Sequence, residues 1–197
     1  MKQKFTILRS NCMPIPVENV DTDQIMPARF LKSTTREGFG DNLFHDWRYD
    51  AEGNPVPDCM FNDPRYAGAR IILAGRNFGC GSSREHAAWA IADAGYRAVI
   101  SSFFADIHRN NELNNFVLPV TVSDAFLTEL FSTVAADPKA EIVIDLPTQT
   151  ITNPATGHAE HFEINSYKKE CFLEGLDDID YLLKKKDAIE AFEKARK

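Results

Sequence analysis

Short apolar runs alternate with helix-forming stretches through the middle of the chain. The apolar runs predict four strands, at residues 70–74, 97–101, 116–122 and 141–146. The stretches between them predict helices over residues 83–94, over 105–113 and from 123 onward, where Ser123 or Asp124 is the N-cap. Strands that alternate with helices in this way are typical of an α/β fold.

The pattern changes towards the C-terminus. Residues 148–164 predict a β-hairpin interrupted by the turn residues 153–157. From residue 166 onward, acidic and basic residues alternate on helical spacing, which predicts two or three surface helices. We therefore expect a single domain over residues 1–197, with a core over about 1–165 and a helical appendage over about 166–197.

Residues 29–64 differ from the rest because glycine, proline, aromatic and charged residues mix there without sustained periodicity. This composition predicts a long, partly ordered loop with a short helix near residues 41–47. Long irregular loops in compact domains are more often functional than idle, so this loop is a candidate for substrate contact.

Composition narrows the class of protein. The 197 residues are 44% hydrophobic and 26% charged, which allows a sizeable core, and the net charge of -7 comes with no basic stripe. Without such a stripe we expect no nucleic-acid partner. The sequence also shows no signal-peptide pattern and no apolar run long enough to span a bilayer, so we expect a cytoplasmic protein without a membrane partner.

The cysteine and histidine spacings do not predict a metal site in this chain. Four cysteines lie far apart without a C-x-x-C pair, at positions 12, 59, 80 and 171, and are interpreted as reduced, mostly buried thiols. His158 and His161 lie three residues apart on a predicted strand, where their rings would face opposite sides. We expect no metal ligands among them.

The stretch NFGCGSSREHA, residues 77–87, concentrates unusual chemistry where the first predicted strand gives way to a helix. Three glycines in and before it allow close approach of the backbone to a ligand, at positions 75, 79 and 81. With Ser82 and Ser83 at the predicted helix N-terminus, backbone N–H groups and the helix dipole would favour an anion, and Arg84 adds a fork suited to a carboxylate or phosphate. The stretch predicts an anion-binding site.

A purely structural interpretation of the same residues remains open. Ser82 and Glu85 have the spacing of a capping box, which for these two residues alone is the favoured interpretation. A positive side chain such as Arg84 is unfavourable in the first turn of a helix, because the N-terminal end of the helix dipole is positive. Its presence there indicates a negatively charged partner. His86 and Cys80 are equally compatible with a packing role and with a role in the binding site. Arginine at 84, and the lack of a G-K-[ST] sequence, argue against dinucleotide and P-loop sites.

Several stretches together resemble a known family. GCGSSREHA at 79–87, NVDTDQI at 19–25, SFFADI at 102–107 and NFVLPV at 115–120 are similar to the swivelling domain of the aconitase superfamily, and within it to 3-isopropylmalate dehydratase small subunits. The resemblance implies a β/β/α swivelling fold in an α/β chain, with C-terminal surface helices. It also implies docking on a separate large subunit that carries a [4Fe-4S] cluster, with no cofactor bound by this chain.

The resemblance implies a hydro-lyase reaction in leucine biosynthesis. In it, 2-isopropylmalate loses water to give 2-isopropylmaleate, and water returns to give 3-isopropylmalate. Ser82 matches the family's base, and Ser83 and Arg84 match residues that bind the substrate carboxylate. A serine hydroxyl is a weak base in water, so Ser82 must act as an alkoxide stabilised by amide donors and a nearby cation. The flanking Gly79, Gly81, Glu85 and His86 are expected to support these residues.

Two further residues match functional positions of the family, and each also has an alternative interpretation. Asp23 matches the second acid of the D-T-D-x-I run and would orient Ser82 or Arg84, although a turn or cap role for residues 21–23 is equally compatible. Arg36 aligns with a substrate-binding arginine of the superfamily, and its alternative is a solvated loop residue.

The sequence departs from the family pattern in one informative place. Bacterial small subunits often carry I-F-Y-G-N where this chain has IHRNN at 107–111. The change puts the exact substrate in doubt more than the chemistry. Two alternatives to the isopropylmalate reaction remain open: a sister hydro-lyase small subunit of the homoaconitate or citramalate type, and a non-enzymatic module that binds a carboxylate or phosphate.

Overall fold

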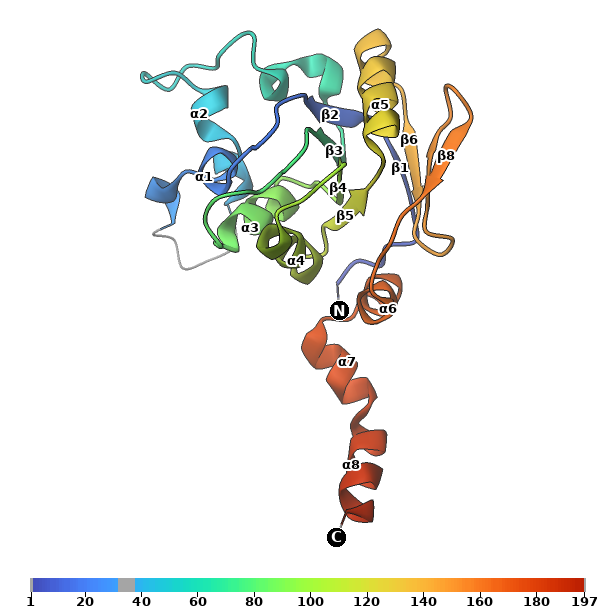
Figure 1. Ribbon diagram of the computed structural model, residues 1–197. Coiled ribbons are helices and arrows are strands. Elements are labelled where there is room, and N and C mark those ends of the chain that lie inside the picture. The colour runs from blue at the N-terminus through green and yellow to red at the C-terminus, as the bar shows by residue number, and fades with distance from the viewer. Residues whose placement is uncertain (1, 32–37, 197) are drawn as a thin grey trace.

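The computed structural model describes residues 2–31 and 38–196, whose strands form two four-stranded sheets (Figure 1). The parallel sheet has the order β2-β3-β4-β5, with bounds Cys12–Ile15, Ile71–Ala74, Ala98–Ser101 and Leu118–Thr121. The antiparallel sheet has the order β1-β6-β7-β8, with bounds Ile7–Ser10, Ile142–Asp145, Thr150–Asn153 and His158–His161. The strands predicted from apolar runs and the predicted hairpin are confirmed.

Burial explains why the two sheets have different sequence patterns. Every residue of β3 and β4 is buried, as expected for a parallel sheet covered on both faces, and both strands are continuous apolar runs. In β6 and β7, buried residues alternate with partly exposed ones because the antiparallel sheet buries one face.

The helices complete the layers of the core. Helices α1 (Thr22–Ile25), α3 (His86–Asp93) and α4 (Asp106–Asn114) lie together beside the parallel sheet, and α5 (Asp124–Ala136) lies between the two sheets (Figure 1). Ser123 caps α5 by accepting a hydrogen bond from the Phe126 amide, as predicted. The buried Asn153 of β7 donates to Glu129 Oε1 at 2.8 Å and Thr133 Oγ1 at 2.9 Å, which fixes α5 on the antiparallel sheet. This layered α/β architecture matches the expected swivelling fold.

The described part of the predicted loop at residues 29–64 contains short helical turns and one isolated antiparallel bridge, between Tyr49 and Pro55. The α-helix α2 spans His45–Arg48, in agreement with the short helix expected near residues 41–47. Single-turn 3-10 helices also occur, namely η1 (Ala28–Phe30), η2 (Gly40–Asn42), η3 (Met60–Asn62) and η4 (Pro64–Tyr66).

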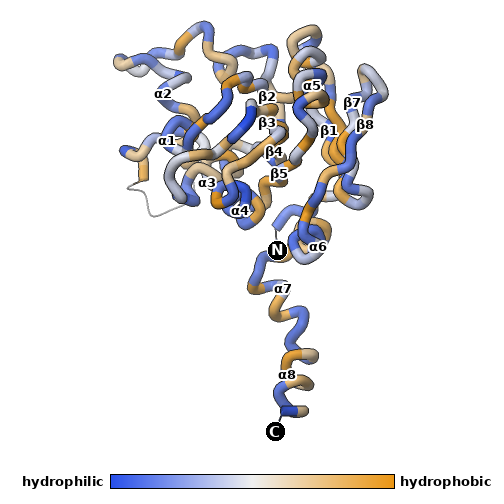
Figure 2. The backbone as a smooth tube through the Cα atoms, viewed as in Figure 1, coloured by the Kyte–Doolittle hydropathy of each residue, from blue (hydrophilic) through white to orange (hydrophobic). Residues whose placement is uncertain are grey.

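Three helices follow the hairpin, and they differ in how they contact the core. Helix α6 (Ser166–Glu174) buries Cys171 and Phe172, and the Phe172 ring packs against Phe5 and Phe116. Helices α7 (Asp178–Lys184) and α8 (Lys186–Ala195) bury none of their residues and extend away from the body (Figures 1 and 2). No helix within residues 2–31 and 38–196 is long and apolar enough to cross a bilayer.

Candidate active site

The glycine-rich stretch lies at the carboxyl end of β3, where a second chain segment is paired with it. The Asn19 amide donates to the Arg76 carbonyl at 2.8 Å, and the Gly79 amide donates to the Val20 carbonyl at 2.8 Å. The Thr22 amide continues the pairing by donating to the Cys80 carbonyl at 2.9 Å. The two stretches singled out in the sequence, residues 19–25 and 77–87, therefore form one structural unit.

Glycine is required at two positions of this loop. Gly79 has φ +76°, and a Cβ at this position would overlap the ring of His108 on α4. Gly81 has φ +89°, and its Cβ would lie 3.2 Å from Cβ of Asp21. Both glycines adopt a left-handed backbone that other residues rarely take, and Gly79 also brings the loop into direct contact with α4.

Arg84 connects the loop to the partner segment. Its Nη1 lies 2.8 Å from Oδ1 of Asp23, and its Nη2 donates to Oδ2 of Asp23 at 2.9 Å, so the two groups pair end to end. The Nε of the same guanidinium donates to Oγ of Ser82 at 2.9 Å. Three residues chosen from the sequence, Ser82, Arg84 and Asp23, are thus brought into direct contact.

The predicted capping box is wrong. Helix α3 begins at His86, three residues later than the predicted start, and Ser82 accepts from Arg84 rather than from a helix amide. The Ser82 carbonyl accepts from the Thr22 hydroxyl at 3.0 Å, which holds this part of the backbone in the loop conformation. Arg84 therefore precedes the first turn, and its negative partner is Asp23, a residue from elsewhere in the chain.

The prediction that Ser82 and Ser83 start the helix is wrong for the same reason. Both side chains are exposed in the loop before α3, and the Ser83 carbonyl lies 3.5 Å from Nδ2 of Asn111 on α4. An anion at these residues would be bound by hydroxyl and guanidinium groups, because the amides of the first helical turn come later in the chain.

The structure assigns the capping role and the ion-pairing role within residues 21–23 to different residues. Asp21 is the N-cap of α1: its carboxylate accepts from the Gln24 amide at 2.7 Å, and its own amide donates to Oε1 of Gln24 at 2.8 Å. Asp23 makes the ion pair with Arg84 instead. The capping role therefore belongs to Asp21, and the orienting role is open to Asp23.

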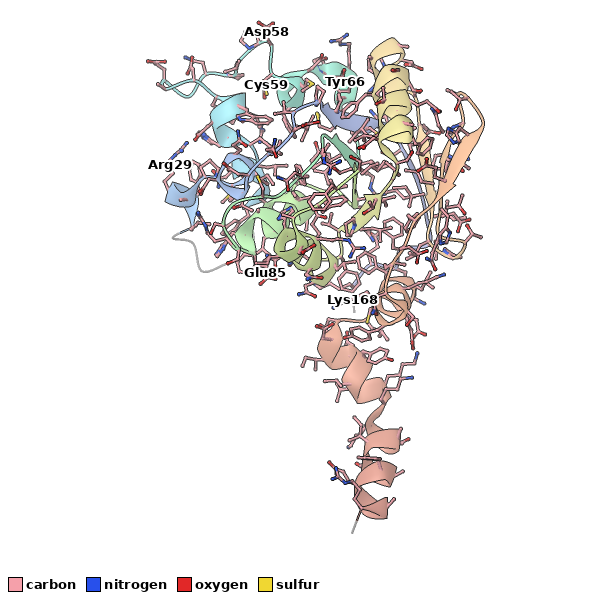
Figure 3. The ribbon with its side chains drawn as sticks, viewed as in Figure 1. Arg29, Asp58, Cys59, Tyr66, Glu85 and Lys168 are labelled. Carbon is pink, nitrogen blue, oxygen red and sulfur yellow. The ribbon has the colours of Figure 1, made fainter. Side chains whose placement is uncertain are left out.

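The remaining neighbours of the loop have structural contacts. Glu85, the N-cap residue of α3, accepts from Nδ2 of Asn115 at 2.8 Å, and Figure 3 shows it at the start of that helix. The His86 ring packs against Trp89 and Phe39, with centroids 4.5 and 5.7 Å away. Both residues support the loop from the side of α3.

Cys80 has the properties of a protonated thiol. Its Sγ donates to the Asn19 carbonyl at 3.2 Å, which adds to the pairing of the two segments. Burial and, secondarily, the charge of Asp21 raise the pKa of the Cys80 thiol. Because the thiolate is the reactive form, this environment makes Cys80 a weak nucleophile.

Two buried titratable side chains beneath the loop were not predicted from the sequence. His108 Nε2 lies 3.1 Å from Oε1 of Glu112, and the two side chains are 1% and 0% exposed. Burial raises the pKa of the Glu112 carboxyl, and the nearby His108 ring opposes this shift. The two residues have an i, i+4 spacing on α4, and His108 lies in the stretch 107–111 that departs from the family pattern.

Arg36, predicted to bind substrate, lies outside the described residues. Within the described part of the chain, no group of three or more His, Cys, Asp and Glu side chains is placed to hold a metal ion.

The pair of Asp23 and Arg84 leads to a prediction. We expect Asp23→Asn to raise KM about tenfold with a smaller effect on kcat, because the neutral amide no longer pairs with both Nη groups and Arg84 is no longer held for a substrate anion. Steady-state kinetics of the variant, combined with the large subunit that the sequence resemblance implies, would measure this.

Asp21→Asn is a matched control, since it removes the same charge two residues away while asparagine remains a good N-cap. Equal kinetic effects in the two variants would show that the charge of this segment matters and the Arg84 contact does not.

The fold and the loop define a class of protein. The family model for the aconitase C-terminal domain matches residues 2–125, and a second model, LeuD_N, matches residues 128–166. The first match covers more than half of the chain and includes every residue of the loop and its partner segment. The chain belongs to the aconitase C-terminal domain family.

Within that family, its full-length relatives are 3-isopropylmalate dehydratase small subunits. The chain is 60% identical over 195 residues to that of Cytophaga hutchinsonii, covering 99% of this chain and 96% of the relative. It is 52% identical over 191 residues to that of Chloroflexus aurantiacus, covering 97% and 94%. The crystal structure of a 3-isopropylmalate dehydratase from Methanocaldococcus jannaschii is similar with a TM-score of 0.66, 25% identity and coverage of 95% and 99%. The resemblance found in the sequence is confirmed.

Proposed function

We propose that this chain is the small subunit of a heteromeric hydro-lyase that converts 2-isopropylmalate to 3-isopropylmalate through 2-isopropylmaleate, in leucine biosynthesis. The names of its full-length relatives support the reaction. The observation that carries the site assignment is the contact of Arg84 with both Ser82 and Asp23. We place the reaction in the cytoplasm.

Ser82 acts as the base that removes the proton beside a substrate carboxylate. An unassisted serine hydroxyl holds its proton too tightly, so the alkoxide must be stabilised where it forms. The Nε of Arg84 donates to Oγ of Ser82, and a charged donor of this kind favours the ionised form of the acceptor. In the reverse direction, the same hydroxyl returns the proton to carbon.

Arg84 and Ser83 bind the substrate carboxylate. Asp23 and Ser82 engage one N–H on each nitrogen of the Arg84 guanidinium, which leaves further Nη hydrogens for an anion. The Arg84 side chain is 29% exposed, and the exposed Ser83 lies next to it in the chain. Asp23 fixes the guanidinium plane and reduces the cost of ordering it when substrate binds.

The large subunit supplies the rest of the site. We propose that it carries the [4Fe-4S] cluster, which when bound provides a Lewis acid for the departing hydroxyl. The small subunit contributes the base and the carboxylate contacts, so neither chain suffices alone. The loop that includes Arg36 is our candidate for choosing the alkyl group of the substrate.

The direct test is an anaerobic reconstitution with the cluster-loaded large subunit of the same organism. We expect 2-isopropylmalate to produce the ultraviolet absorbance of the conjugated alkene in the mixture and in neither chain alone. Alkene formation only from homoaconitate or citramalate-type substrates would point to a sister hydro-lyase. A verified complex that dehydrates none of these would overturn the enzymatic assignment in favour of an anion-binding module.

A further inference from the structure

Three large apolar side chains are exposed at the carboxyl edge of the parallel sheet. Val17 is 43% exposed, Phe103 47% and Ile107 56%, and we call these three residues the edge patch. The fold buries comparable side chains directly beside them, since Phe78 is 0% exposed and Phe104 3%. Single exposed apolar residues are ordinary, but clustered ones commonly mark an interaction site.

Backbone contacts place the three residues of the edge patch beside one short segment. The Val17 carbonyl packs against Gly75, where a Cβ would overlap it. The Phe103 carbonyl accepts from the Asn77 amide at 2.9 Å. Ile107 lies in the first turn of α4, which is anchored two residues earlier where Ala105 donates to the Phe78 carbonyl at 3.1 Å. All three residues therefore flank residues 75–78, immediately before the loop that holds Ser82 and Arg84.

Charged groups border the edge patch without covering it. The Arg76 guanidinium lies 5.6 Å from the centre of the Phe103 ring and forms an ion pair with Asp124 at 3.6 Å. An apolar centre with a polar rim is the usual composition of a protein interface.

We propose that the edge patch is the surface on which the large subunit docks, an inference that rests on the proposed function. Ser82, Ser83 and Arg84 are open to solvent, whereas a base that works as an alkoxide needs water excluded. The chain that completes this site must therefore approach along the same edge. A partner with apolar side chains opposite the edge patch would seal the site and bring its own catalytic groups to Ser82.

The test measures assembly independently of turnover. We expect Phe103→Glu and Ile107→Glu each to weaken binding of the immobilised large subunit by about 100-fold, because the carboxylate would lose its water against apolar side chains of the partner. Ile7→Glu is the matched control, an isoleucine 61% exposed on β1 of the other sheet, and it should change the Kd less than about threefold. Circular dichroism and thermal melts would establish that all three variants fold.

Each outcome bears on the proposal. Unchanged Kd values for both edge-patch variants, or an equal loss in Ile7→Glu, would overturn it. Self-association of the isolated chain that Phe103→Glu abolishes would also overturn it and assign the surface to a second copy. If the wild-type complex binds through the edge patch but dehydrates none of the malates, the docking surface stands and the proposed reaction fails.

Discussion

Ser82→Ala is expected to lower kcat of the assembled enzyme at least about 100-fold while leaving the Kd for the large subunit unchanged. The substitution removes Oγ, which accepts a hydrogen bond from Arg84 Nε and is the proposed base. Because Ser82 is exposed and does not cap α3, the free energy of unfolding should change by less than about 0.5 kcal/mol. Single-turnover measurements of alkene formation and a thermal melt would check the two parts separately.

Ser132→Ala serves as the control for this variant. Ser132 lies on α5, and its hydroxyl donates to the Thr128 carbonyl within the same helix at 2.9 Å, so its loss should leave kcat unchanged. A loss of less than about tenfold in Ser82→Ala would argue that Ser82 is a structural contact of Arg84 and that another group is the base.

Gly79→Ala is expected to have the largest effect on stability, a loss of more than about 3 kcal/mol in the free energy of unfolding. The added methyl group would overlap the His108 ring, which is buried against Phe78 and paired with Glu112 and so has little room to move. The φ of +76° adds a further cost. Denaturant melts would measure the loss, and kcat should fall as the loop shifts.

Gly53→Ala separates the two causes. Gly53 has φ +83°, close to that of Gly79, but a Cβ there would meet nothing within 4 Å. We expect this variant to lose only about 1 kcal/mol, the cost of the backbone conformation. Equal losses at the two positions would mean that the contact with His108 carries no stability.

The sequence predicted β3 and β4 because burial on both faces of a parallel sheet leaves continuous apolar runs. Strands β1 and β2 were not predicted. The sequence also singled out Ser82, Arg84 and Asp23, and the structure brings them together. The start of α3 was misplaced because Ser82 and Glu85 have the spacing of a local cap. The loop conformation is instead stabilised by contacts with Thr22 and Asp23. These residues lie far away in the chain, so local spacing carries no information about them.

The buried pair of His108 and Glu112 illustrates the other limit. Polar residues dominate α4, so the helix pattern gives no sign that two titratable side chains lie against the core. Their burial depends on Gly79, whose missing side chain leaves space for the ring, and that space exists only once β3 and α4 are packed. Contacts between elements, rather than periodicity within one, decide such positions.

The pairing of residues 19–23 with residues 76–84 has a consequence for how the chain acquires activity. The contacts between Asp23 and Arg84 and between Cys80 and Asn19 each join residues 61 positions apart. Long-range contacts of this kind form after local helices, because the entropy of closing the intervening loop must first be offset. During refolding, helical signals should therefore recover before turnover does. A newly made chain would have helices before it has a site.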